Sequence, residues 1–65
     1  MIPLHTAEQL ARDWRGEARG RFWGCRSAAG VRDVFALLWR EAEGAADTDL
    51  GAIMEEFQAA LRRFR

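Results

Sequence analysis

Arginine supplies the chemistry that stands out most in this sequence. All ten basic residues are arginine, and ten Asp and Glu residues balance them to zero net charge, which argues against a polycation that coats nucleic acid. Ser27 and the small residues after it could open a helix whose free amides bind an anion. Arginine adds bidentate hydrogen bonds to carboxylate or phosphate. We predict an anion-binding "arginine end" that consists of Arg26, Arg32, Arg62, Arg63 and Arg65. The alternative is an ordinary solvated helix end.

Acidic residues gather in the second half of the chain. Glu41 and Glu43 fall where a predicted helix ends, and negative charge there opposes the helix dipole. Stability of the helix alone does not favour this placement. We predict an acidic docking surface for an arginine-rich partner, including a second copy of this chain. It consists of Glu41, Glu43, Asp47 and Asp49. The alternative is a solvated turn that is rich in acid.

The segment 19–26 mixes arginine, glycine and aromatic residues. Single-stranded nucleic acid is held by such groups, because bases stack on aromatic rings while arginines contact phosphates. The alternative is that Phe22 and Trp23 fold back to close the core, since a short chain needs its large aromatic side chains for burial. Both interpretations stay open at the level of sequence.

Catalytic and metal-binding patterns are missing from the sequence. The chain has one cysteine, Cys25, and one histidine, His5, which lie far apart in sequence. No internal disulfide can form, and we expect no Cys–His catalytic pair. The acidic segment at Asp47 resembles the start of a calcium loop, but its twelfth position is Gln58 rather than the required glutamate. We therefore predict no enzyme activity, cofactor, metal site or small-molecule substrate.

Three segments with helical periodicity must position these groups. We predict helices over residues 7–19, 28–43 and 48–63, which begin at caps on Thr6, on Ser27 and in the stretch 47–49. Gly20 predicts a break near 19–20, followed by a short irregular or helical piece through Arg26, because glycine costs about 1 kcal/mol in a helix. Strand signals are almost absent, so the predicted fold is all-α.

The apolar residues of the segment 28–43 cover about 200° of a helical wheel, which predicts a central helix that is buried on two sides. The short connection after Gly44 predicts that the second and third helices form an antiparallel hairpin. Such a hairpin brings the arginine end together at one pole and the acidic residues at the other. No linker is visible, so we expect one domain over residues 1–65.

The small size of the chain predicts self-association. A core built from 65 residues supplies only about 3–5 kcal/mol of stability. A homodimer that shares apolar surface would add to it. The predicted contact row on the third helix consists of Leu50, Met54, Phe57, Leu61 and Phe64.

These observations favour a small binding protein. We expect a non-enzymatic adaptor, regulator or inhibitor that docks charged and apolar helix surfaces on a protein partner. The alternative is a nucleic-acid-binding regulator that uses the arginine end. We find no signal peptide and no apolar run of about 18–20 residues, so we expect a cytoplasmic protein without a membrane span.

Overall fold

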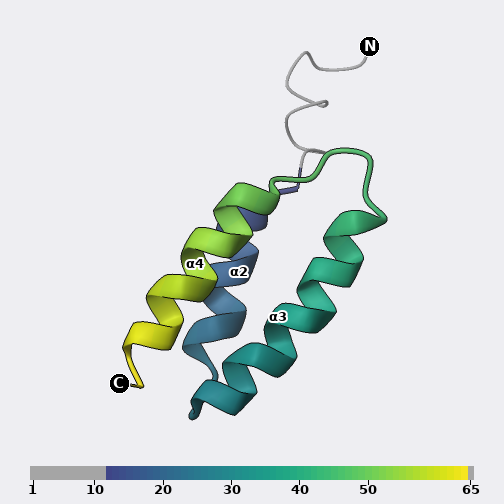
Figure 1. Ribbon diagram of the computed structural model, residues 1–65. Helices are drawn as coiled ribbons and strands as arrows, with labels where there is room; N and C mark the ends of the chain where they lie inside the picture. Colours follow the sequence, from purple (N-terminus) through teal and green to yellow (C-terminus); the bar gives the residue numbers. More distant parts are fainter. Residues whose placement is uncertain (1–11, 65) are drawn as a thin grey trace.

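Three helices make up the computed structural model, which describes residues 12–64 (Figure 1). Helix α2 spans Trp14–Trp23, α3 spans Ala28–Glu43 and α4 spans Leu50–Arg62. No strand occurs within residues 12–64. The all-helical, three-helix prediction is confirmed. The bounds of α3 match the predicted ones, and α4 is slightly shorter than predicted.

Helix α2 differs from the predicted first helix at both ends. It begins at Trp14, after the non-helical Arg12 and Asp13, and it continues through Gly20 to Trp23. The predicted break at 19–20 is therefore wrong. Because the helix continues past Gly20, Phe22 is buried in the core and is only 1% exposed. Burial of a phenylalanine side chain contributes about 1.5–3 kcal/mol, which exceeds the cost of one helical glycine. The predicted cap at Thr6 lies outside the described residues.

Side-chain oxygens cap the start of each described helix. Asp13 accepts a hydrogen bond from the Gly16 amide, and the Ser27 hydroxyl accepts one from the Gly30 amide, each at 3.0 Å. Asp49 caps α4 in the same way through the Ala52 amide, also at 3.0 Å. Each bond satisfies an amide that has no partner inside its helix. The predicted cap at Ser27 is confirmed, and the cap of α4 is narrowed to Asp49.

The core takes small and large apolar residues from all three helices. Its buried members are Trp14, Ala18, Phe22, Val31, Leu38, Ala42, Ala52, Ile53 and Ala60. Aromatic rings connect the helices beside this core. The ring of Phe57 on α4 stacks on that of Phe35 on α3, with centroids 4.0 Å apart, and lies 6.0 Å from that of Phe22 on α2. Phe57 thus contacts both other helices.

Helix α4, rather than α3, is the best-packed element of the bundle. It contacts α2 most extensively, it also contacts α3, and the contact between α2 and α3 is the smallest. Figure 1 shows the end of α2, the start of α3 and the end of α4 at the same end of the bundle. The prediction that the helix over 28–43 is central is wrong, because α3 leaves Leu37 63% exposed.

The loop between α3 and α4 is fixed to the start of α2. The indole nitrogen of Trp14 donates a hydrogen bond of 2.7 Å to the carbonyl oxygen of Asp47. Since Trp14 is itself buried, this bond satisfies a polar atom that would otherwise be unpaired in the core.

None of the helices formed by residues 12–64 has the length and apolar character needed to cross a membrane.

Candidate functional site

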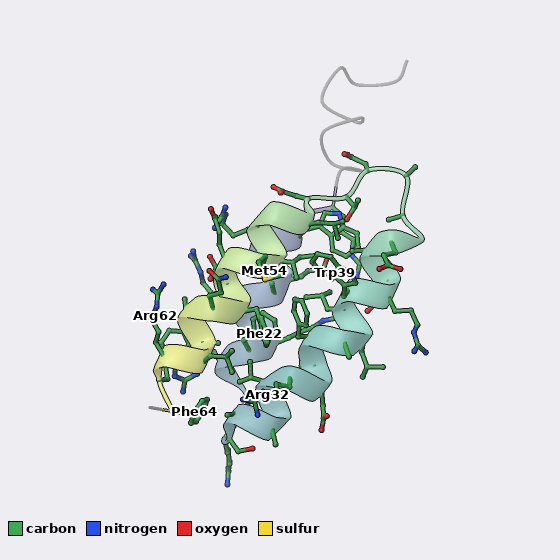
Figure 2. All side chains as sticks on the ribbon, in the orientation of Figure 1. Phe22, Arg32, Trp39, Met54, Arg62 and Phe64 are labelled. Carbon is green, nitrogen blue, oxygen red and sulfur yellow. The ribbon has the colours of Figure 1, made fainter. Side chains whose placement is uncertain are left out.

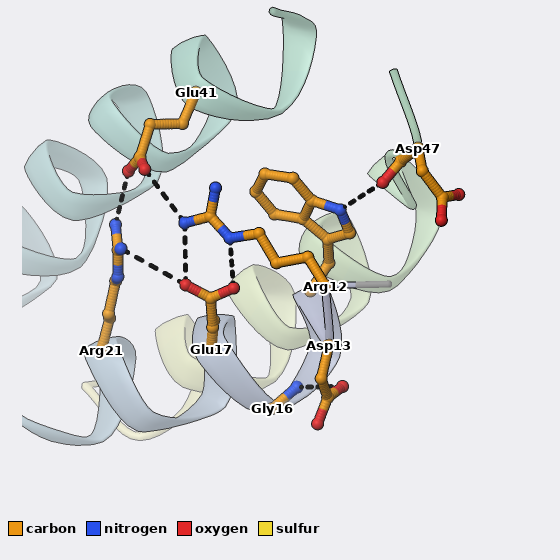
Figure 3. Close-up of polar contacts among 8 residues, drawn as sticks. Arg12, Asp13, Gly16, Glu17, Arg21, Glu41 and Asp47 are labelled. Carbon is orange, nitrogen blue, oxygen red and sulfur yellow. Dashed lines mark hydrogen bonds and ion pairs between the residues drawn. The ribbon is translucent and has the colours of Figure 1, made fainter. Parts of the chain in front are cut away.

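Two ion-pair networks tie α2 to its neighbours, and the first reaches α3 (Figure 3). Arg12 is bonded to Glu17 through two of its nitrogens and to Glu41 through Nη2, at 3.0 Å. Arg21 reaches Glu41 at 2.8 Å and Glu17 at 3.5 Å. Hydrogen bonds from Arg12 lower the pKa of Glu17, and those from Arg21 and then Arg12 lower the pKa of Glu41. The hydrogen bonds that Arg12 donates to Glu17 and to Glu41 raise the pKa of Arg12 above its usual range.

The second network joins α2 to α4. Arg15 contacts Glu55 at 2.6 Å and Glu56 at 3.0 Å, and Arg19 contacts Glu56 at 3.2 Å. The pKa of Glu56 is lowered, chiefly by its hydrogen bond from Arg19. Four arginines of residues 12–21 are therefore paired with Glu17 and with carboxylates of α3 and α4; they are Arg12, Arg15, Arg19 and Arg21. They hold the bundle together and leave other residues to act as a binding site.

These networks predict that the bundle loses stability in acid. Because the carboxyl pKa values are lower in the folded protein than in the unfolded chain, the networks stabilise the fold fully above about pH 4.3. That contribution is lost as the pH falls through the folded-state values. We expect a steady melting temperature from pH 7 to about 5.5 and a fall below about 4.3. Thermal melts followed by circular dichroism check this, and Glu56→Gln should flatten the fall. A melting temperature that stays constant far into acid would contradict the prediction.

Two of the four residues of the predicted acidic docking surface have partners within this chain. Glu41 belongs to the first network, and the Asp49 carboxylate caps α4. The contacts of Glu41 with Arg12 and Arg21 were not predicted, because these partners lie 20 or more residues away in sequence. The spacing of four residues between Glu17 and Arg21 is a signal from which one pair of this network could be found. The other two residues of the predicted surface, Glu43 and Asp47, are exposed and remain available to a partner.

The arginine end is only partly brought together. Arg63 stacks over the Trp23 ring at 4.2 Å and donates a hydrogen bond of 3.5 Å to the Phe22 carbonyl. The other described members are exposed and form no ion pair with another described residue; they are Arg26, Arg32 and Arg62. Figure 2 shows Arg32 and Phe64 at the lower end of the bundle, whereas Arg62 projects from the left side of α4. Arg65 lies outside the described residues.

A groove lies between α2 and α4, next to Trp23. It has a volume of about 420 Å³ and is lined by Arg19, Phe22, Trp23, Glu56, Ala59, Ala60 and Arg63. The two aromatic neighbours in its wall differ: Phe22 is 1% exposed and Trp23 is 62% exposed. Core closure, one of the two interpretations of the segment 19–26, is thus confirmed for Phe22 but wrong for Trp23. The exposed indole and the guanidinium of Arg63 form the most distinctive feature of this groove.

The contact row predicted on the third helix, called the α4 row from here on, is half-buried at each of its five residues. Its members Leu50, Phe57, Leu61 and Phe64 pack against the core of their own chain. Their first role is therefore inside the bundle.

Among residues 12–64, no group of His, Cys, Asp and Glu side chains is arranged to hold a metal ion. Cys25 is half-buried, with its Sγ 3.5 Å from the Arg21 carbonyl oxygen.

Comparison of the chain with known protein families, curated proteins and solved structures finds no match.

Proposed function

We propose that this protein is a non-enzymatic helical binding module that docks on an acidic segment of another protein. The observation that carries the proposal is the 62% exposed Trp23 beside Arg63 at the edge of the α2–α4 groove. Exposed aromatic and arginine side chains dominate the energetics of protein interfaces. We place this activity in the cytoplasm.

Charge supports an acidic partner. The arginines of both networks already have carboxylate partners, whereas Arg26 and Arg62 form no ion pair with another described residue. An acidic segment supplies the missing carboxylates, and an apolar side chain of the same segment fills the groove against the face of Trp23. Arginine binds carboxylate through paired hydrogen bonds, which gives such a complex its orientation.

A nucleic-acid-binding regulator is the second candidate function. The exposed indole of Trp23 favours it, because a base stacks on an aromatic face while arginines contact the phosphates. The carboxylate of Glu56 in the wall of the groove weakens this candidate, since it repels phosphate. An acidic protein segment reaches the same arginines while placing only an apolar side chain in the groove.

The test removes charge from the arginine end. We expect Arg62→Gln combined with Arg63→Gln to weaken binding of a labelled peptide of glutamate and leucine about tenfold or more, because two charge-assisted contacts are lost. Fluorescence anisotropy measures the affinity. Arg12→Gln is the matched control, since it also removes an arginine but lies before α2, outside the groove and the arginine end, and it should leave the affinity unchanged.

An oligothymidylate probe separates the two candidates. Tight binding of this probe, with log K falling linearly with log salt, would support the nucleic-acid function and contradict the protein function. Peptide affinity that the double substitution does not change would contradict the role of the arginine end.

Self-association is also part of the proposal. Support comes from the half-buried α4 row and from the 63% exposed Leu37, which together leave apolar surface uncovered in a chain of 7.4 kDa. We interpret α3 and α4 as an antiparallel hairpin, which places the start of α3 beside the end of α4. A second copy would cover this apolar surface and add stability to a small core.

A further inference from the structure

The side of α3 that faces away from the core forms a continuous exposed surface, called the outer face of α3 below. Its residues lie within an arc of about 100° on the helix, opposite to the buried Val31, Leu38 and Ala42. They are Ala29, Asp33, Ala36, Leu37, Arg40 and Gly44, and all are exposed. The large apolar side chain among them, Leu37, lies at the middle of the helix and is 63% exposed.

The charges of this face have no partners among the described residues. Asp33 and Arg40 are both absent from the two ion-pair networks, and so are Arg32 and Glu43 at its edge. Asp33 and Arg40 are seven residues apart, so about 10 Å along the axis separates them within one helix. A partner that presents the opposite charges at the same spacing would satisfy both.

We infer that the outer face of α3 binds the outer face of α3 in a second copy of this chain, with the two helices antiparallel. A twofold axis between residues 36 and 37 places Asp33 of each copy opposite Arg40 of the other. The same register brings Leu37 of one copy against Leu37 of the other next to the axis, because both side chains lie on the same flank of the face. Because such an interface is isologous, the pair of Asp33 and Arg40 occurs twice.

The edge of the face fits the same register. Arg32 and Glu43 lie on one side of the outer face, so an antiparallel second copy brings Arg32 near its Glu43 and Glu43 near its Arg32. Residues on the same flank of two antiparallel helices face each other across the interface. The charge pattern along α3 is thus complementary to itself when reversed, and a parallel pairing would instead oppose like charges.

The shape of the face also fits a helix. Ala29, Ala36 and Gly44 have little or no side chain, which allows two backbones to approach closely. A hollow of about 350 Å³ lies beside them and is lined by Phe35, Ala36, Trp39, Arg40 and Glu43. Leu37 lies on the other flank of the face and meets Leu37 of the second copy next to the twofold axis, so the interface buries an apolar side chain that is 63% exposed in one copy.

This inference rests on the proposed self-association and names its surface. The α4 row offers little surface to a second copy. Phe57 is stacked on Phe35, and most of the row packs on the core of its own chain. The outer face of α3 has no such commitment within residues 12–64. A second copy therefore gains more new contact at α3 than at α4.

Charge reversal tests the pairing in the full chain. We expect the wild type to have twice its 7.4 kDa mass in sedimentation equilibrium. Asp33→Arg alone and Arg40→Asp alone should each raise the dimer dissociation constant about tenfold or more, because like charges then oppose each other across the twofold axis. An equal mixture of the two variants should restore the dimer, since each introduced charge meets its opposite. Gln58→Arg, which adds a charge at an exposed position of α4 outside this face, should leave the mass unchanged.

The outcomes distinguish whether the protein dimerises at all from whether it dimerises through the outer face of α3. Circular dichroism confirms that each variant is folded, and dimer formation in the mixture shows it independently. A wild type that is monomeric at all concentrations overturns both the self-association and the pairing of α3. A dimer that neither reversal weakens overturns only the α3 surface. Variants that dissociate but do not recombine overturn the antiparallel register.

Discussion

Replacing Phe22 by alanine is expected to unfold the protein. The residue is 1% exposed, and its ring lies beside Phe57 where α2 meets α4. Removing a buried phenylalanine ring costs about 3–5 kcal/mol, because apolar contacts are lost and a cavity remains. A single core of this size supplies about the same amount in total. We therefore expect Phe22→Ala to lose its cooperative thermal transition and most of its helical circular dichroism signal.

The neighbouring aromatic residue provides the matched control. Trp23 is 62% exposed, and its main described contact is the guanidinium of Arg63 at 4.2 Å. Loss of an exposed cation–π contact costs about 0.5–1 kcal/mol, so Trp23→Ala should fold and melt only a few degrees lower. If Trp23→Ala were the more damaging of the two, α2 would present the opposite face to the bundle.

Introducing a charge at position 57 is expected to be at least as damaging. The Phe57 ring stacks on Phe35 with centroids 4.0 Å apart and contacts Phe22 on the other side. A carboxylate at this position lies beside the rings of Phe22 and Phe35 and loses part of its hydration, which costs several kcal/mol. We expect Phe57→Asp to be unfolded at 25 °C when its unfolding is followed by circular dichroism and urea titration.

Phe57→Leu separates the loss of the ring from the burial of a charge. Leucine keeps an apolar side chain between α2 and α3, so this variant should stay folded and lose about 1–2 kcal/mol. A folded Phe57→Asp protein with the melting temperature of the wild type would contradict the packing described for α4, because it would place the side chain at the surface.

Features that depend on neighbouring residues could be predicted from the sequence. The start of α3 follows from Ser27, because its hydroxyl bonds the amide only three residues later. The end of the same helix follows from Gly44, since the periodic apolar residues stop there and glycine favours a helix terminus. The all-helical fold follows likewise from the spacing of apolar residues along each segment. None of these features needs information about which helix lies beside which.

Features that depend on contacts between helices were decided by the tertiary structure. Gly20 predicts a break, yet α2 continues because Phe22 gains a place in the core, and sequence spacing does not reveal that gain. The exposure of Trp23 has the same origin, since the orientation of α2 buries one aromatic residue and exposes the next. Glu41, predicted as part of a docking surface, instead accepts hydrogen bonds from Arg12, just before α2, and from Arg21 on α2, which lie 20 or more residues away in sequence. Ion pairs between helices form wherever packing brings opposite charges within reach, so their partners are set by the arrangement of the three helices.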